Sequence, residues 1–327
     1  MWIQESLYKI QSRWIDQASL HLARLWFRQS GSIPRIMRMV MLSIWSSNPL
    51  KREKSPPEID LAVVFAEKDC ELIPFVVAGA IQSSANPIRV VRLVTPDWGL
   101  CTAEEALSAI RELQSTFGFA LETFEDEELL GREKIEALRH HRIPDRGFGW
   151  VVQQVLKLSV VLMSQQRATL VVCADTVLTY KRTWLDSAGR QLLLANEWFR
   201  SLWTDDVESF LQLKKSIPLS FITHHQLMQR EIVAEIFGER GERLVDWATS
   251  ASRRIAEYET YGTFLYEVYP KRAVVARFGN VEVSNRQEIT LRNPNERHNE
   301  ILGVNNENTL SISLHHYLEN GTDRFSG

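Results

Sequence analysis

The sequence has few cysteines, and their arrangement would not hold a small fold together. Its 327 residues include only Cys70, Cys101 and Cys173, which are odd in number and lie far apart. This pattern excludes a disulfide framework and the close cysteine pairs of a structural zinc site. We therefore expect free thiols in a reducing compartment and predict a cytoplasmic protein.

Long apolar runs and a strong net charge are also absent. No run reaches the roughly 20 residues that span a bilayer, and no short charged-then-apolar signal peptide opens the chain. The formal net charge is only −3, which argues against a general nucleic-acid binder. Hydrophobic residues make up 44% and charged residues 24% of the chain, the balance of a globular protein with a real core.

Charge is unevenly distributed along the chain. Residues 1–54 hold nine Lys and Arg against three Asp and Glu, whereas the remainder holds 29 against 38. Apolar residues recur at helical spacing in this basic segment, and four tryptophans lie among them: Trp2, Trp14, Trp26 and Trp45. We predict a helical extension over residues 1–55. It is expected to pack on the main domain or on the second subunit of a homodimer; the alternative is that it binds the inner face of a membrane.

Residues 56–290 alternate between short apolar runs and helical patterns. The apolar runs predict strands at 60–65, 88–94, 119–124, 190–195 and 273–278. The helical patterns fall at 71–83, 102–117, 126–142, 150–164, 226–237 and 242–256. This alternation predicts an α/β fold, a mostly parallel mixed sheet flanked by helices. Residues 291–327 are polar and are predicted to form a C-terminal tail.

One more apolar run ends at a carboxylate. Leu170-Val171-Val172 is followed by Cys173-Ala174-Asp175-Thr176. Ligands of α/β folds bind outside the carboxyl ends of the strands, and one carboxylate together with substrate phosphates can hold Mg²⁺. Cys173 is too soft a ligand for such an ion, so we expect it to point into the core as free Cys usually does. Alternatively, Asp175 and Thr176 only form a turn.

A second candidate region spans residues 146–158. Arg146 and Lys157 can bind phosphate or carboxylate groups, and the glycines of the loop 143–149 let its backbone approach a ligand. The helix that follows has a polar face opposite its apolar stripe, made of Trp150, Gln153, Gln154 and Lys157. Amides and Trp suit a sugar or a base. The alternative is an ordinary solvated face.

Two further clusters contain groups with catalytic chemistry. His224 and His225 are adjacent, so at most one of them can reach a metal ion if they lie on a strand; a structural histidine is the alternative. Glu257 and Glu259 alternate with tyrosines before Gly262, and a carboxylate can act as base toward a hydroxyl group. The alternative is a helix end that Gly262 caps.

The order of these blocks resembles a bacterial family of GT-A-like glycosyltransferases. The pattern is Arg-x-x-Gly-Trp-x-x-Gln-Gln-x-x-Lys-Leu, then Asp-Thr-Val, His-His and Glu-Tyr-Glu-x-Tyr-Gly, within about residues 58–270. The resemblance implies a GT-A (Rossmann-like) fold, a nucleotide-sugar donor, a divalent metal ion (Mn²⁺ or Mg²⁺) and a place in polysaccharide biosynthesis. Cys173 stands where the family's metal motif has its first Asp, and Ala256 where the family more often has Ser.

The resulting prediction is a transferase that moves a sugar to a glycan or a lipid-linked acceptor. The predicted metal ligands are Asp175, His224 and His225. The predicted donor-binding residues are Arg146, Trp150, Gln153, Gln154, Lys157 and Thr176. The predicted catalytic residues are Asp175, Glu257 and Glu259. The alternatives are metal-independent transfer and a catalytically inactive nucleotide-sugar-binding partner of another transferase.

Overall fold

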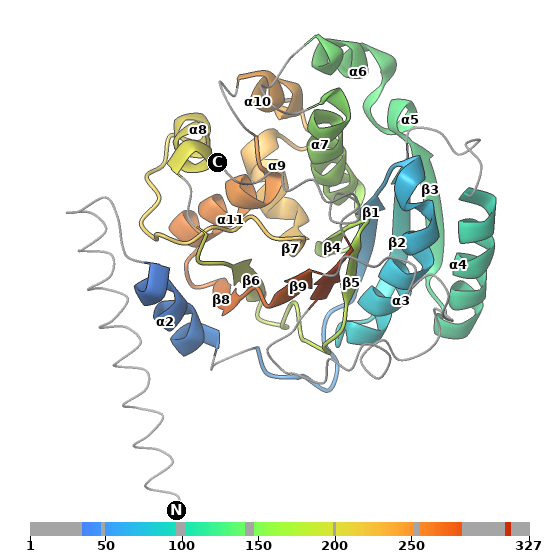
Figure 1. Cartoon of the computed structure of the whole chain (residues 1–327), viewed down its shortest axis with the longest axis horizontal. Coiled ribbons are helices and arrows are strands. Elements are labelled where there is room, and N and C mark those ends of the chain that lie inside the picture. Colours follow the sequence, from blue (N-terminus) through green and yellow to red (C-terminus); the bar gives the residue numbers. More distant parts are fainter. Residues whose placement is uncertain are drawn as a thin grey trace, which may run out of the picture.

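The computed structural model describes residues 35–46, 50–95, 103–140, 147–198, 201–250, 255–282 and 311–314. Arg146, most of the predicted extension and most of the predicted tail lie outside these ranges. Figure 1 shows a central sheet with helices packed on both of its faces. None of the helices in the described part of the chain has the length and apolar character that crossing a lipid bilayer requires.

The central sheet has five strands in the order β3-β2-β1-β4-β7. They are β1 (Ile59–Val64), β2 (Ile88–Thr95), β3 (Ala120–Glu125), β4 (Ala168–Cys173) and β7 (His225–Gln229). The first four strands in this order are parallel, and β7 runs antiparallel to β4. The predicted α/β class, a mostly parallel mixed sheet flanked by helices, is confirmed.

Each face of the sheet packs against its own layer of helices. Residues along β1 alternate between two cores, Ala62 and Val64 on one face and Leu61 and Val63 on the other, because side chains of a strand point to opposite faces. The first core includes α7 (Phe148–Met163), α9 (Arg230–Phe237), α10 (Leu244–Ser250) and α11 (Glu257–Val268). The second core includes η1 (Glu67–Leu72), α3 (Ile73–Ser83) and α4 (Ala103–Phe117).

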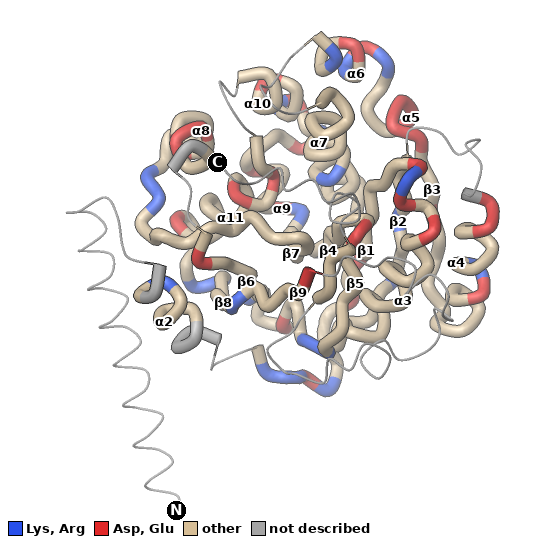
Figure 2. Tube along the Cα trace, in the orientation of Figure 1, with Lys and Arg blue, Asp and Glu red and all other residues tan. Residues whose placement is uncertain are grey.

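The remaining elements lie around this frame. They are α5 (Asp126–Leu130), α6 (Arg132–Arg139), α8 (Ser201–Leu211), β5 (Thr176–Leu178), β6 (Gln191–Ala195), β8 (Ala273–Arg277), β9 (Asn280–Glu282) and β10 (Ser311–Ser313). Figure 2 shows that peripheral helices such as α4, α5 and α6 carry many of the charged residues. Two small sheets, β5-β10-β9 and β6-β8, complete the fold.

Segments predicted to lie outside the main domain take part in it. Helix α2 (Arg35–Ser46) packs against β8, and its Leu42 is fully buried in the core. Strand β10 comes from the predicted tail and pairs with both β5 and β9. Residues 35–46 of the predicted extension therefore contact the main domain. Residues 1–34 and 47–49 of the extension lie outside the described residues, and membrane binding through residues 1–55 stays a prediction.

Several predicted boundaries were wrong. The predicted helix 226–237 begins as β7, and only residues 230–237 are helical; the apolar spacing did not separate a short strand from the helix that follows it. The loop predicted over 143–149 ends earlier, because α7 already begins at Phe148. Gly262 is not a cap but lies inside α11, where an added Cβ would come within 2.5 Å of the Phe221 ring.

Candidate functional site

Three possible metal ligands meet at the carboxyl end of β4. Cys173 is the last residue of that strand, Asp175 lies in the turn that follows, and His224 immediately precedes β7. Since β7 runs antiparallel to β4, its start lies beside the end of β4, and the Cys173 N–H donates to the His224 carbonyl oxygen at 2.8 Å. The thiol, a carboxylate oxygen and an imidazole nitrogen lie within 4.8 Å of one another.

This placement refines the prediction for Cys173. All three residues of the cluster are half-buried. Cys173 packs against the core on the α7 face of the sheet, and its sulfur also lies within 4.8 Å of the ligand atoms of Asp175 and His224. The set of a carboxylate, an imidazole and a thiol fits a divalent cation, because each of these groups is a common protein ligand for such ions. Among the described residues, this is the one group of three or more His, Cys, Asp or Glu side chains with that geometry.

A buried polar network lies directly beside the cluster. The Lys157 ammonium group donates to Glu257 Oε1 at 2.7 Å and lies 3.4 Å from Cys173 Sγ. The hydroxyl of Tyr258 is 3.8 Å from the same sulfur. With its amide nitrogen turned toward the carboxylate, Gln154 donates to Glu257 Oε1 at 3.2 Å. Glu257 is therefore held by two donors from α7 at the beginning of α11, where a negative charge suits the helix dipole.

The surroundings of these groups determine their protonation at neutral pH. Burial raises the pKa of the Cys173 thiol to about 11, against the opposing effect of Lys157. Burial by itself lowers the pKa of Lys157, but Cys173 and Glu257 outweigh it, so this pKa lies above its usual value. In the absence of a metal ion, Cys173 is therefore a thiol and Lys157 is an ammonium ion at pH 7.

The predicted donor-binding face of α7 is not a solvated face. Gln154 and Lys157 are buried, because the sheet lies on one side of α7 and other helices pack on the rest of its circumference. Trp150 and Gln153 are half-buried. The amide of Gln153 donates to the Val64 carbonyl at 3.3 Å, at the carboxyl end of β1, and the ring of Trp150 contacts that of Trp203 edge to face, with centroids 6.1 Å apart.

Thr176 also has internal partners. Its side chain is fully buried, and its hydroxyl donates to Asp175 Oδ1 at 3.2 Å and lies 3.1 Å from Ser313 Oγ. Donor binding by Thr176 stays a prediction, and the contacts of its hydroxyl in the structure are with Asp175 and Ser313. The contact with Ser313 could not be anticipated, because Ser313 is far away in the chain.

His225 lies in the core and not in the metal cluster. Its ring is fully buried and neither ring nitrogen has a hydrogen-bond partner. It packs edge to face on Trp184 at 5.6 Å and also contacts Phe278 at 5.5 Å between centroids. Since adjacent residues point to opposite sides, His224 is the one of the pair that faces Asp175. The prediction of His225 as a metal ligand is corrected accordingly.

We expect His225 to make the protein sensitive to acid. Burial, with smaller effects of His224 and Arg182, lowers its pKa from 6.5 to about 3. The unfolded chain therefore binds a proton below pH 6.5 that the folded chain does not, and the free energy of unfolding falls as the pH falls through this window. When the pH is lowered from 7 to 5.5, the free energy of unfolding of His225→Phe should fall by about 1 kcal/mol less than that of the wild type.

Urea unfolding at the two pH values measures this difference. The substitution of the exposed His140 at the end of α6 by Gln is the control and should keep the wild-type pH dependence. Equal losses of stability in the wild type and His225→Phe would contradict the burial of an uncharged His225.

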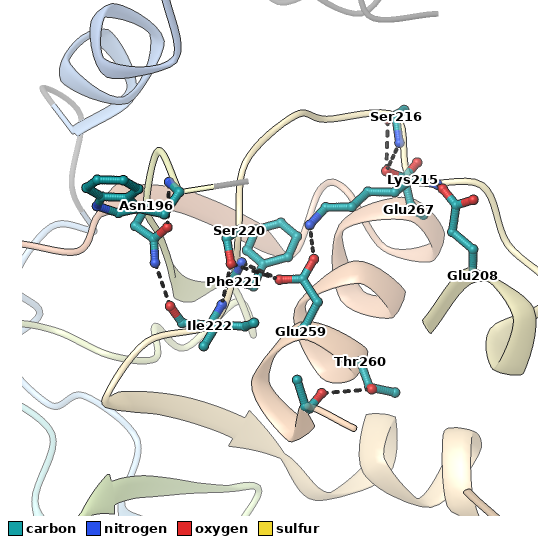
Figure 3. Close-up of polar contacts among 12 residues, drawn as sticks. Asn196, Glu208, Lys215, Ser216, Ser220, Phe221, Ile222, Glu259, Thr260 and Glu267 are labelled. Atoms are coloured by element: carbon teal, nitrogen blue, oxygen red, sulfur yellow. Dashed lines mark hydrogen bonds and ion pairs between the residues drawn. The ribbon is translucent and has the colours of Figure 1, made fainter. Parts of the chain in front are cut away.

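Glu259 belongs to a separate structural network. Figure 3 shows its carboxylate between Lys215 and the segment at Ser220 and Phe221. Glu259 accepts hydrogen bonds from the Lys215 ammonium group, from the Phe221 N–H at 2.7 Å and from Ser220 Oγ at 3.3 Å. Both Lys215 and Glu259 are buried. The catalytic role of Glu259 stays a prediction, and the structure places its carboxylate in an internal ion pair. The sequence could not show this pair, because Lys215 is 44 residues away from Glu259.

No family model and no curated protein matches the chain. Solved glycosyltransferase structures resemble it. Mouse xyloside xylosyltransferase 1, apo form, has 11% identity and a TM-score of 0.41 over 70% of this chain and 88% of that one. The galactosyltransferase LgtC in complex with donor and acceptor sugar analogs has 11% sequence identity and a TM-score of 0.43, over 78% of this chain and 87% of that one. The bifunctional glycosyltransferase WbbM has 7% sequence identity and a TM-score of 0.44, over 81% of this chain and 47% of that one. Such values assign neither a family nor an activity to this chain.

Proposed function

We propose that the chain is a glycosyltransferase that moves a sugar from a nucleotide-sugar donor to an acceptor. The observation that supports this most is the meeting of Asp175, His224 and Cys173 at the carboxyl end of β4. Ligands of open α/β sheets bind outside these strand ends, and a cation held there attracts a diphosphate. The resemblance of the sequence blocks to GT-A-like glycosyltransferases agrees with this position.

In this proposal, Asp175 and His224 hold a divalent cation, which the resemblance gives as Mn²⁺ or Mg²⁺. When bound, such an ion neutralises charge on the leaving nucleotide diphosphate. The hydroxyl of Thr176 donates a hydrogen bond to the Asp175 carboxylate and orients it toward the ion. Trp150 and Gln153, which are only half-buried, are the described residues of α7 that we assign to the donor. Arg146 keeps its predicted phosphate contact as a proposal outside the described residues.

Lys157 and Glu257 take roles different from those predicted from the sequence. Because they form a buried ion pair, Lys157 is not available as a phosphate ligand nor Glu257 as a base while the pair is intact. We assign both to positioning: they fix α7 against α11 and place a neutral pair behind the cluster. The cytoplasmic location, the membrane or homodimer contact through residues 1–55 and the glycan or lipid-linked acceptor remain predictions.

Binding of a nucleotide-sugar in the presence of Mn²⁺ is the direct test of this function. We expect one or more members of a panel of nucleotide-sugars, varied in base and sugar, to raise the Tm. A ligand at 100 times its Kd stabilises the folded state by about 2.7 kcal/mol, which corresponds to a rise of a few degrees. The rise should require the ion and should be absent in Asp175→Asn.

Asp246→Asn, on the exposed surface of α10, is the matched control and should respond as the wild type does. A rise that persists in excess EDTA would favour metal-independent transfer. No rise with any nucleotide-sugar would contradict the proposed donor class.

A second candidate function is nucleotide-sugar binding without transfer. It is favoured by one specific observation: both carboxylates predicted to act as a base, Glu257 and Glu259, are buried and ion-paired. In that case the donor would raise the Tm while release of the nucleotide diphosphate stayed at the rate without protein, with water and with a broad panel of acceptors.

A further inference from the structure

The cluster at the end of β4 contains a sulfur atom, and this has consequences for the ion that binds there. Three ligands on one tetrahedral ion, with bonds of 2.0–2.3 Å, lie roughly 3.3–3.8 Å apart. The ligand atoms of Cys173, Asp175 and His224 lie within 4.8 Å of one another, so small side-chain rotations bring all three onto one ion. The pairing of β4 with β7 and the hydrogen bond from the Cys173 N–H to the His224 carbonyl hold the backbones of these two residues side by side.

The three donor atoms differ in softness. Mg²⁺ takes oxygen ligands in octahedral geometry and keeps several waters. Thiolate and imidazole instead suit Zn²⁺ and related transition ions. Three protein ligands with one position left for water or substrate are the arrangement of catalytic zinc sites. The fourth position here would take a phosphate oxygen of the donor.

The groups behind the sulfur are compatible with an ion. Lys157 lies 3.4 Å from Cys173 Sγ, but its charge is offset by Glu257 at 2.7 Å. The Tyr258 hydroxyl, 3.8 Å from the sulfur, and the Lys157 ammonium group can both donate to a thiolate. Such outer contacts orient a ligand and tune its affinity for the metal. Tyr258 and Lys157 are therefore positioning residues of this site.

We propose that Cys173 is the third ligand of the ion, so that the site selects a borderline transition ion such as Zn²⁺ or Co²⁺ and binds Mg²⁺ poorly. This inference deepens the proposed function, since it rests on the same site and narrows the class of ion. Cys173, which stands in place of the first Asp of the metal motif, would then change which metal ion binds and would not remove a ligand.

Titration of the metal-free full-length chain with Co²⁺ alone tests the inference without any donor. We expect saturation at one ion per chain and the near-ultraviolet charge-transfer absorption of a cobalt–thiolate bond. Cys173→Ser should lose this band and at least about 10–100-fold of the Co²⁺ affinity. Cys70 is buried in the 3₁₀ helix η1, which precedes α3. Cys70→Ala should keep both the absorption band and the Co²⁺ affinity. Zn²⁺ should displace Co²⁺, and equimolar Mg²⁺ should not.

Thermal unfolding of each metal-free variant establishes that it is folded. Saturable Co²⁺ binding without the thiolate band in the wild type, or displacement by equimolar Mg²⁺, would overturn the proposal. Nucleotide-sugar binding with Mn²⁺ in that case would leave the proposed function intact. The reverse result, a Cys173-dependent band without binding of any nucleotide-sugar, would support the metal assignment and contradict the donor class.

Discussion

The substitution Asp175→Asn is expected to lower the rate of sugar transfer at least about 100-fold while the fold persists. Loss of groups that only support metal ligands costs about 10–100-fold in affinity or activity, and Asp175 is proposed as a direct ligand. Asn has the same shape but no charge, so the ion loses the one anionic oxygen that the described cluster supplies. The fall should appear in turnover and in the concentration of metal ion needed for half-maximal rate.

The structure explains why this variant should remain folded. The carboxylate is half-buried, and one of its contacts is the hydrogen bond from the Thr176 hydroxyl at 3.2 Å, which an amide oxygen can also accept. The main-chain carbonyl of Asp175 accepts from the Leu314 N–H at 2.8 Å, and this contact is independent of the side chain. We therefore expect the free energy of unfolding without metal to change by less than about 1 kcal/mol.

Release of nucleotide diphosphate from the donor identified by thermal shift, in the presence of excess acceptor, measures the rate. Asp246→Asn should retain it, because that carboxylate is exposed on α10, away from the cluster. Wild-type turnover in a folded Asp175→Asn protein would remove this residue from the site and, with it, the proposed metal assistance.

The frame of the sheet could be predicted because its signals are local. Runs such as 60–65 and 88–94 are mostly apolar on both faces, apart from Asp60, Arg89 and Arg92, and they became β1 and β2 with ends shifted by at most one residue. A strand covered by helices on both sides is typically a near-continuous apolar run. The position of Asp175 just beyond such a strand followed from the same pattern, without knowledge of any contact.

The polar interior could not be predicted because its partners are distant in sequence. Lys157 and Gln154 were placed on a polar face from the helical period alone, yet their partner Glu257 is 100 residues from Lys157. A buried ion pair and a solvated pair have the same sequence pattern. The proximity of Cys173 and His224 could not be predicted for the same reason: only the antiparallel pairing of β7 with β4 brings His224 beside Cys173.

Breaking the buried pair of Lys215 and Glu259 is expected to cost about 3–5 kcal/mol of unfolding free energy, because the buried Lys215 charge loses its ion-pair partner and keeps only the weaker electrostatic effects of Glu267 and Glu208. Glu259→Gln is the sharper variant, since the amide oxygen can still accept from the Phe221 N–H while the ion pair is lost. Lys215 is left in a site where burial already lowers its pKa despite the opposing effect of Glu259. Urea unfolding of the variant and the wild type measures the loss.

Two further measurements distinguish the effect of the buried Lys215 charge from the effect of lost side-chain packing. Lys215→Met together with Glu259→Gln also removes the buried cation, so this double variant should be more stable than Glu259→Gln alone; the double-mutant cycle gives the coupling of the pair. In Glu259→Gln, the folded chain holds the Lys215 proton less tightly than the unfolded chain does. Stability should therefore recover as the pH rises toward 10, since the unfolded state then binds more protons than the folded state. A single variant with wild-type stability at neutral pH would mean that Lys215 reaches water or another acid, and that the Glu259 carboxylate is not what holds the Ser220–Phe221 segment against α11.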